Sequence, residues 1–305
     1  MERELAIRLA AHEWLDAGLA EGKEAWTQAE LAAFHFGDER IQLMDRQRGI
    51  KKPATMSAAL SIRTVYRRPG QPRPYQDETG PDGLLRYKWR GDAFDHPENR
   101  ALREAMVRDL PLLWFYGVAE GLYAAIYPVF LLREEPEQHQ FVVALDEEQH
   151  LLRPGTMTEP VRRYVERKTW QRLHQPAFRA GVMLAYEHRC SICALGHSAL
   201  LDAAHITADA DERGEPVTSN GLALCKLHHG AYDAGILGIR PDLTIHVRQD
   251  VLDEVDGPML RHGLQEHHEK SLLVVPRSRR DRPDRERLGE RYESFLRRRL
   301  PVGAA

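Results

Sequence analysis

Two short-spaced pairs of metal-binding residues constrain this chain more than any other feature of its sequence. Cys190 and Cys193 form a Cys-x-x-Cys pair, and Cys225 and His228 form a later Cys-x-x-His pair. Two such pairs can close a tetrahedron around Zn²⁺, and four protein ligands leave no open position for water. The spacing therefore predicts a structural zinc site. A disulfide is the alternative, and a reducing compartment would disfavour it.

Length, leader and apolar content point to a soluble protein. At 305 residues the chain is long enough for two domains that need no disulfides. Glu2, Arg3 and Glu4 stand where a secretory leader would carry an apolar run. The longest apolar stretch, 110–132, is interrupted by glycine, glutamate and proline, so it does not provide a membrane span. We therefore expect a cytoplasmic protein with reduced cysteines and no membrane contact.

Charge is informative only in its distribution. The formal net charge of −3 gives no sign of a polyanionic partner, but arginines crowd the C-terminal part of the chain. They are Arg277, Arg279, Arg280, Arg282, Arg285, Arg287, Arg291, Arg297, Arg298 and Arg299. They either contact phosphates or pair with the acidic residues of a solvated helix, namely Asp281, Asp284, Glu286, Glu290 and Glu293.

The first half of the chain alternates between helix and strand signals. Residues 3–20 space five apolar side chains as one helical stripe, ended by Gly22; they are Leu5, Leu9, Trp14, Leu15 and Leu19. A short helix should begin at Thr27 with Glu30 as its capping-box partner. Six β-rich runs follow, at 40–43, 61–66, 84–89, 111–116, 124–131 and 141–145, with a helix at 99–108. This pattern is typical of a barrel-like β domain.

A polar, acidic stretch at 136–160 followed by a basic helical stretch at 161–181 indicates a join between domains. We expect a first domain at 1–150, a helical linker at 151–180, and a second domain at 181–305 that carries the zinc site and the arginine-rich tail. The expected class is α+β.

The residues between the two metal-binding pairs suggest catalysis. The segments Leu201-Asp202-Ala203-Ala204-His205, Asn220-Gly221-Leu222 and His228-His229-Gly230-Ala231-Tyr232-Asp233 occur in this order. The order resembles the HNH, or ββα-metal, nucleases over about 50 residues. In that family, a histidine ending the first strand activates water, an asparagine orients it, and the following helix holds a divalent metal. The resemblance implies that His205 is the general base, Asn220 the orienting amide and His229 a metal ligand.

The chemistry of phosphodiester hydrolysis fits these residue types. An imidazole titrates near neutral pH and can deprotonate water, and a cation such as Mg²⁺ or Mn²⁺ can stabilise charge on the phosphate oxygens. His229 and Asp233 are four residues apart, so on a helix they share a face and can reach one ion. Many HNH enzymes carry a further ligand just before the base, where this chain has Ala204. Asp202 lies on the same strand face as Ala204 and could substitute for that ligand, or it could be a surface residue.

Segments of the first half resemble the SRA domain, a PUA-like barrel that extrudes a modified cytosine from duplex DNA. They are Arg73-Pro74-Tyr75-Gln76-Asp77-Glu78, Tyr87-Lys88-Trp89-Arg90-Gly91 and Asn99-Arg100-Ala101-Leu102. The family has Tyr-Thr-Gly where this chain has Trp-Arg-Gly, so either Tyr87 or Trp89 could be the second stacking residue beside Tyr75. Asp77 or Glu78 could accept from the exocyclic amine of the base. Alternatively, the aromatic residues belong to a barrel core.

An SRA-like reader joined to an HNH domain resembles the modification-dependent, type IV-like restriction endonucleases of the McrA type. That resemblance implies cleavage of double-stranded DNA that carries 5-methylcytosine or a related base. Double-strand cleavage would need two active sites, so we expect a homodimer. Two alternatives stay open: an HNH nicking or homing-type nuclease that reads unmodified DNA, and a non-catalytic zinc-containing DNA-binding protein.

Overall fold

The computed structural model of the chain describes residues 2–66, 80–151, 159–208, 211 and 214–298. The chain divides into two compact units, Met1–Ala177 and Phe178–Ala305, which are described separately. None of the helices in the described ranges combines the length and the apolar content that crossing a bilayer requires. Both units mix helices and strands, which confirms the expected α+β class.

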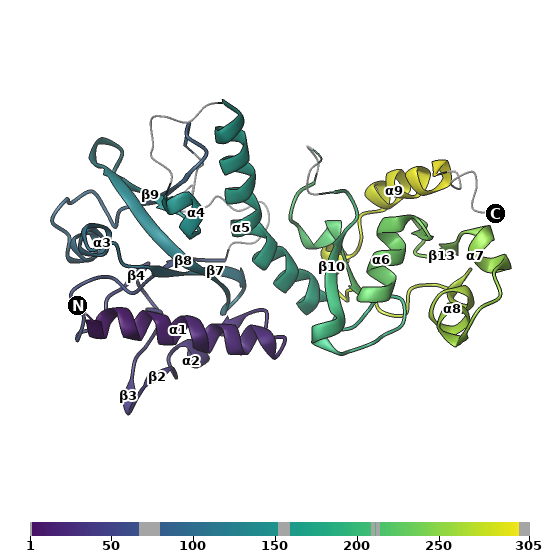
Figure 1. The fold of residues 1–305 in the computed structure, drawn as a ribbon, viewed down its shortest axis with the longest axis horizontal. Helices are drawn as coiled ribbons and strands as arrows, with labels where there is room; N and C mark the ends of the chain where they lie inside the picture. Colours follow the sequence, from purple (N-terminus) through teal and green to yellow (C-terminus); the bar gives the residue numbers. More distant parts are fainter. Residues whose placement is uncertain (1, 67–79, 152–158, 209–210, 212–213, 299–305) are drawn as a thin grey trace. The chain divides into compact units, whose positions relative to one another are not determined.

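The elements of the first unit are shown in Figure 1. Its helices are α1 (Glu2–Ala20), α2 (Gln28–Leu31), α3 (Pro97–Val107) and α4 (Glu147–His150), with a 3₁₀ turn η1 (Pro136–Gln138). Its strands are β1 (Trp26–Thr27), β2 (His35–Phe36), β3 (Glu39–Arg40), β4 (Ile50–Lys51), β5 (Ser61–Thr64), β6 (Leu85–Lys88), β7 (Leu112–Ala119), β8 (Leu122–Glu135) and β9 (Gln140–Ala144). Helix α5 (Glu159–Ala185) begins in this unit and ends in the second.

One seven-stranded sheet organises the first unit. Its strands follow the order β4-β5-β7-β8-β9-β6, and β1 adds to β8. Strands β5 and β7 are parallel, and the other pairs are antiparallel. The sheet curls, and the hydroxyl of Tyr87 on β6 donates to the carbonyl of Gly49, the residue before β4, at 3.1 Å. The Tyr87 side chain thus connects the two edge strands of the sheet, β6 and β4. The described strands form a half-barrel, whereas the sequence predicted a barrel.

Both faces of this sheet are covered, which explains why β7 reads as a continuous apolar run. Leu113 and Phe115 pack in one cluster with α1, while Leu112, Trp114 and Tyr116 pack in another with α3 and with Leu173 of α5. All five of these β7 side chains are buried. The sheet is therefore the middle of three layers, with α1 on one side and α3 on the other.

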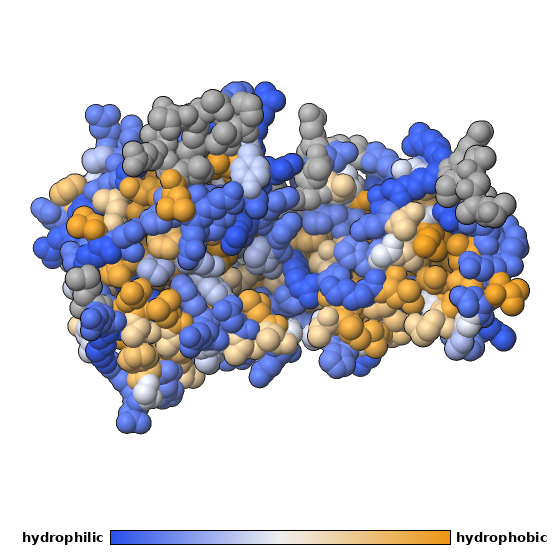
Figure 2. All heavy atoms as spheres, in the orientation of Figure 1, coloured by the Kyte–Doolittle hydropathy of each residue, from blue (hydrophilic) through white to orange (hydrophobic). Residues whose placement is uncertain are grey.

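Helix α1 forms where the sequence predicts it, but the predicted stripe is only partly right, because Leu15 is buried and Leu5, Leu9 and Leu19 are exposed. Ile7, Ala11 and Leu15 are fully buried, whereas Leu5 and Leu9 are 39% and 50% exposed. The reason is that Ile7, Ala11 and Leu15 recur every four residues and face the sheet, while Leu5 and Leu9 point elsewhere on the helix. Figure 2 shows small apolar patches between hydrophilic residues on the face of the molecule that it draws.

The strand predicted at 40–43 is also largely wrong. Only Glu39–Arg40 pairs, with His35–Phe36. Ile41 and Leu43 are buried, but their backbone amides donate to the carbonyls of Phe34 and Leu31, so they pack on the short α2 region outside the main sheet. The capping box of Thr27 and Glu30 is confirmed, and the remaining predicted strands and helices form with shifted ends.

The second unit is built from short elements. Its strands are β10 (Leu201–His205), β11 (Gly221–Cys225), β12 (Leu237–Ile239) and β13 (Ile245–Val247). Its helices are α6 (Lys226–Ala234), α7 (Gln249–Asp253), α8 (Pro258–Gly263) and α9 (Arg285–Arg297), with 3₁₀ turns η2 (Ser198–Leu200), η3 (Thr218–Asn220), η4 (Gln265–His267) and η5 (Arg279–Asp281). One apolar cluster forms its core and includes Val182 of α5 and Leu222 and Leu224 of β11.

The predicted linker, 151–180, contributes to both cores. Val165 and Leu173 of α5 are buried in clusters of the first unit, whereas Phe178 and Val182 are buried in the core of the second. The boundary between the compact units, at Ala177 and Phe178, therefore falls within a helix.

A buried arginine attaches α1 to the sheet. Arg8 is fully buried, and its two terminal nitrogens donate to the carbonyls of Pro111 and Ala59 at 2.7 and 2.6 Å. These carbonyls stand just before or near the starts of the parallel strands β7 and β5. Burial lowers the pKa of Arg8 to about 10, so the guanidinium stays charged at neutral pH.

We expect Arg8→Met to lower the free energy of unfolding of the first unit by about 2–4 kcal/mol, because two buried carbonyls lose their donors. Urea unfolding followed by tryptophan fluorescence measures this unit alone, since all five tryptophans lie before Phe178. The control is Arg3→Met on the exposed side of α1, where an ion pair with Glu39 is lost and we expect a change within about 0.5 kcal/mol. Equal stability of the two variants would contradict the assigned role of Arg8.

Candidate active site

A hairpin and a helix form the centre of the second unit. Strands β10 and β11 are antiparallel, with Leu201 opposite Cys225 and His205 opposite Gly221. Helix α6 follows β11 directly, with Cys225 as its N-cap residue, and ends at Gly235, whose φ of 68° suits glycine. This order places Asp202 and His205 on β10, Cys225 at the end of β11, and the remaining predicted histidines and Asp233 on α6. Asn220 ends the turn η3 just before β11, and the first cysteine pair precedes the hairpin.

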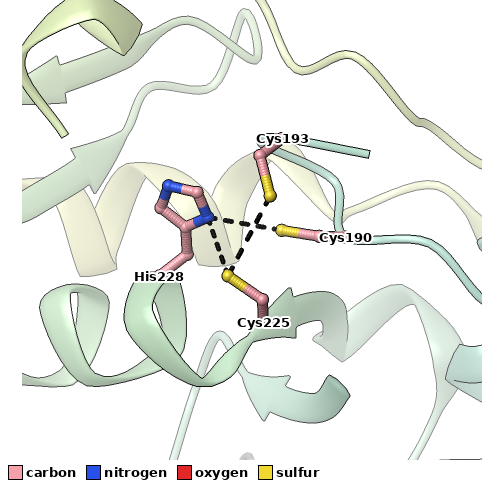
Figure 3. Close-up of side chains that lie close together, drawn as sticks. All are labelled: Cys190, Cys193, Cys225 and His228. Atoms are coloured by element: carbon pink, nitrogen blue, oxygen red, sulfur yellow. Dashed lines mark hydrogen bonds between the residues drawn. The ribbon is translucent and has the colours of Figure 1, made fainter. Parts of the chain in front are cut away.

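The four predicted zinc ligands come together (Figure 3). His228 Nδ1 lies 3.4 Å from Cys190 Sγ and 3.1 Å from Cys225 Sγ, and the sulfurs of Cys193 and Cys225 are 4.0 Å apart. All four ligand atoms lie within 4.8 Å of one another. A tetrahedron with Zn–S bonds of about 2.3 Å and Zn–N bonds of about 2.0 Å separates its ligands by about 3.5–3.8 Å. The cluster therefore fits zinc.

The second nitrogen of His228 fixes how the ring binds. His228 Nε2 lies 2.8 Å from the carbonyl oxygen of Gly263 in α8. A carbonyl only accepts, so Nε2 carries the proton and Nδ1 turns its lone pair toward the three sulfurs. The ring is 1% exposed. This arrangement is the one that a metal-binding histidine requires.

His205 ends strand β10, as the sequence predicts. Its imidazole is half-buried and stacks on the ring of Phe178 in α5, with centroids 4.0 Å apart and planes tilted by 16°. Stacking against a buried aromatic ring restricts the side chain to a narrow range of orientations. A proton acceptor at the end of this strand is thus held in place by the helix behind it.

Asn220 is fully buried and holds the loop that follows His205. Its side-chain oxygen accepts from the amide of Thr207 at 2.8 Å, and its nitrogen donates to the carbonyls of Thr207 and Glu215 at 3.1 and 3.0 Å. Its own carbonyl accepts from the amide of Ile206. These hydrogen bonds hold the connection between β10 and β11. Because His205 is the last residue of β10, they also fix the position of His205.

The three predicted ligands of the catalytic metal form a row through one imidazole. His229 Nδ1 lies 3.2 Å from Asp202 Oδ2, and His229 Nε2 lies 3.2 Å from Asp233 Oδ2. The two nitrogens of an imidazole point to different sides of the ring. A single ion at Nε2 can therefore be shared with Asp233, while Asp202 accepts at Nδ1 and orients the ring.

The cysteine–histidine cluster is the one set of three or more His, Cys, Asp or Glu side chains within ligand range of one another in the described ranges. His229 and Asp233 are nevertheless a suitable pair for a cation. When Asp202 accepts the hydrogen bond from Nδ1–H, the lone pair of Nε2 is available to an ion placed between Nε2 and the Asp233 carboxylate. Adjacent ligands of an octahedral Mg²⁺ lie about 3 Å apart, close to the observed 3.2 Å.

Positive side chains surround Asp202. Lys226 Nζ and Arg179 Nη1 lie 2.7 and 3.2 Å from Asp202 Oδ1. Burial disfavours the charged carboxylate, but hydrogen bonds from Lys226 and His229 outweigh burial and hold the pKa of Asp202 below its usual value. Asp202 is therefore a charged partner of His229 at neutral pH.

The predicted base-pocket residues are placed only in part. Tyr75, Asp77 and Glu78 lie outside the described residues. Tyr87 and Trp89 are 8% and 3% exposed and belong to the same apolar cluster. The Tyr87 hydroxyl donates to the carbonyl of Gly49, beside the other edge of the half-barrel. The Trp89 indole stacks on the ring of His139, with ring centroids 4.9 Å apart. Both rings thus take part in the core of the first unit.

Several residues near the site were not found from the sequence. They are Phe178 and Arg179 of α5, Lys226 at the start of α6, and Arg291 of α9. Lys226 had a usable signal, since it directly follows a zinc ligand and begins the helix that carries His229. The others approach from distant parts of the chain, so no local pattern indicates them.

The site is a strand–strand–helix centre beside a cluster of three cysteines and one histidine that could hold zinc. Residues 190–240 match the family model described as HNH endonuclease, which spans the cysteine pair, the hairpin and α6. This part of the chain is therefore an HNH endonuclease domain, as the sequence predicted.

Two solved structures match parts of the chain with low TM-scores. The modification-dependent TagI restriction endonuclease is 17% identical, with a TM-score of 0.34 over 84% of this chain and 88% of that one. The type IV phosphorothioation-dependent restriction endonuclease ScoMcrA is 13% identical, with a TM-score of 0.22 over 61% of this chain and 48% of that one. No curated protein sequence matches the chain. The assignment of a nuclease domain therefore rests on the family match.

We expect Cys190→Ser to lose zinc and to unfold the second unit, because structural zinc binding is coupled to folding. Elemental analysis should fall from one zinc per chain to almost none, and the helical circular dichroism signal should decrease. Ser191→Ala is the matched control: this buried hydroxyl has no hydrogen-bond partner in the described part of the chain, so zinc should be retained. A folded, zinc-free Cys190→Ser protein would refute the structural role.

Proposed function

We propose that this protein is an HNH endonuclease that hydrolyses DNA phosphodiesters with His205 as general base. The observation that carries the proposal is the HNH match over a hairpin and helix that place His205 at a strand end and pair His229 with Asp233. A non-catalytic zinc protein would need the cysteine cluster but neither His205 nor the row of Asp202, His229 and Asp233.

The reaction is hydrolysis of a P–O bond by one water molecule. His205 accepts a proton from water while the water oxygen forms a bond to phosphorus. The bond from phosphorus to the leaving oxygen breaks, and that oxygen takes a proton from solvent, so the products are a phosphate monoester and a hydroxyl end. Phe178 holds the His205 ring, and Asn220 holds the loop behind it.

Charge stabilisation completes the site. His229 and Asp233 would hold a divalent cation such as Mg²⁺ or Mn²⁺, which lowers the energy of negative charge on the phosphate oxygens. Asp202 orients the His229 ring through Nδ1. Lys226, whose side chain is 58% exposed beside Asp202, supplies a further positive charge at the first turn of α6.

We further propose that the first unit reads DNA that carries 5-methylcytosine or a related modified cytosine. The support is the resemblance of its segments to the SRA domain, together with the contact between two of them. The Asn99 side chain accepts from the amide of Arg90 and donates to the carbonyls of Arg90 and Ala93, which fixes the turn after Trp89. A homodimer would supply the second active site for double-strand cleavage.

We expect His205→Ala to reduce DNA cleavage by at least about 10²-fold, because the reaction loses its proton acceptor. Single-turnover cleavage of a supercoiled plasmid measures the rate. Zinc content and thermal unfolding should stay near those of the wild type, since His205 is no zinc ligand. His262→Ala, at an exposed histidine of α8, should cleave normally. Full activity of His205→Ala would exclude this residue as the base.

We expect the wild-type protein to cleave methylated DNA about tenfold or more in preference to unmodified DNA, equivalent to about 1.4 kcal/mol. The experiment compares matched duplexes that differ in one cytosine methyl group, with a third duplex that carries a phosphorothioate linkage. Equal cleavage of all three would leave an HNH nuclease that reads unmodified DNA. Nicked and linear products in the same assay distinguish single-strand from double-strand cleavage.

A further inference from the structure

Helix α9 packs against the nuclease centre although it lies outside the segment that matches HNH endonucleases. Leu288 is fully buried, and Phe295 lies against β12. A Cβ atom on Gly238 of β12 would lie 2.8 Å from the Phe295 ring, and one on Gly235 would lie 2.7 Å from Arg298 Cδ. The Phe295 and Arg298 side chains occupy the space that the two glycines leave. Figure 1 shows α9 next to α6 in the second unit.

Two arginines of α9, and Arg298 just after it, contact residues outside the helix. Arg287 Nη2 lies 3.0 Å from Glu215 Oε2 in the loop between β10 and β11. Further along the helix, Arg291 Nη2 lies 3.2 Å from Asp233 Oδ1, and Arg298 donates to the Asp233 carbonyl at 2.5 Å. These arginines are thus engaged by the nuclease centre, which the solvated-helix interpretation of the sequence does not describe.

Arg291 is itself well fixed. Its guanidinium lies over the ring of Tyr232, 4.8 Å from the centroid, and also approaches the Tyr232 carbonyl at 3.4 Å. Asp233, in contrast, has a side chain that is 58% exposed. An exposed carboxylate at the last turn of a helix would sample several rotamers without such a partner.

We propose that Arg291 is a positioning residue of the nuclease centre. By binding Asp233 Oδ1 it keeps Oδ2 turned toward His229 Nε2, so that one nitrogen and one oxygen ligand are arranged for a divalent cation before the cation binds. This inference rests on the proposed function of His229 and Asp233 as ligands. The positive charge of Arg291 opposes cation binding, and with its side chain 23% exposed, solvent screens that charge only in part. The positioning role requires the gain from a fixed ligand to exceed this repulsion, and the effect of removing Arg291 on the Kd decides between the two.

The test is Mn²⁺ binding to the zinc-loaded full chain, measured by electron paramagnetic resonance of free Mn²⁺ in the absence of DNA. Arg291→Met should raise the Kd for Mn²⁺ by about tenfold or more, the range found when partners of metal ligands are removed. Arg291→Gln retains a donor for Oδ1 without the charge and should give an intermediate Kd. Arg287→Met removes a comparable ion pair of α9 that does not touch Asp233, so its Kd should equal the wild-type value.

The outcomes separate the inference from the proposed function. Unchanged or tighter Mn²⁺ binding by Arg291→Met would overturn the positioning role, and so would an equal loss in Arg287→Met, which would indicate general undocking of α9. Zinc content and thermal unfolding of each variant identify misfolding; if Arg291→Met does not fold, the comparison of Arg291→Gln with Arg287→Met decides. A wild-type protein that neither binds Mn²⁺ nor cleaves DNA would instead refute the proposed function.

Discussion

The contact of Cys190, Cys193, Cys225 and His228 joins the segments that build the centre of the second unit. Strands β10 and β11 and helix α6 are only five, five and nine residues long, and they share one apolar core with the rest of the unit. Zinc would join the loop before the hairpin, the end of β11 and the first turn of α6. The bond from His228 to Gly263 extends this connection to α8.

The same contact sets the rotation of α6. His228 and His229 are consecutive, so on a helix their side chains diverge by about 100°. Fixing His228 on the sulfurs therefore turns His229 toward Asp202 and Asp233. Charges then alternate outward from this ring, with Lys226 and Arg179 beyond Asp202 and Arg291 beyond Asp233. Each carboxylate thus has a cationic partner on the side away from His229, and these half-buried and exposed charges offset one another.

The predictions from the sequence were most accurate for features that depend on the spacing of residues close together in the chain. The zinc ligands, the strand that ends at His205, and the helix that pairs His229 with Asp233 all follow from residues close in the chain. Long-range packing decided the rest. Nothing local shows that Ile7 and Ala11, and not Leu5 and Leu9, would face a sheet, because both sets have helical spacing. Arg291 and Asp233 are 58 residues apart, and the separate placement of Asp202 and Asp233 on two nitrogens of His229 depends on the packing of α6 against β10.

The bond between His228 and the carbonyl of Gly263 also bears on how long the protein survives in a cell. Helix α8 is six residues long and follows an exposed turn in which Val255 is 97% exposed. A chain without zinc would no longer hold the His228 ring, the donor that ties α8 to α6, and the exposed segment before α8 would become accessible to proteases. Metal supply would then govern the abundance of the protein through its degradation, separately from any effect on its chemistry.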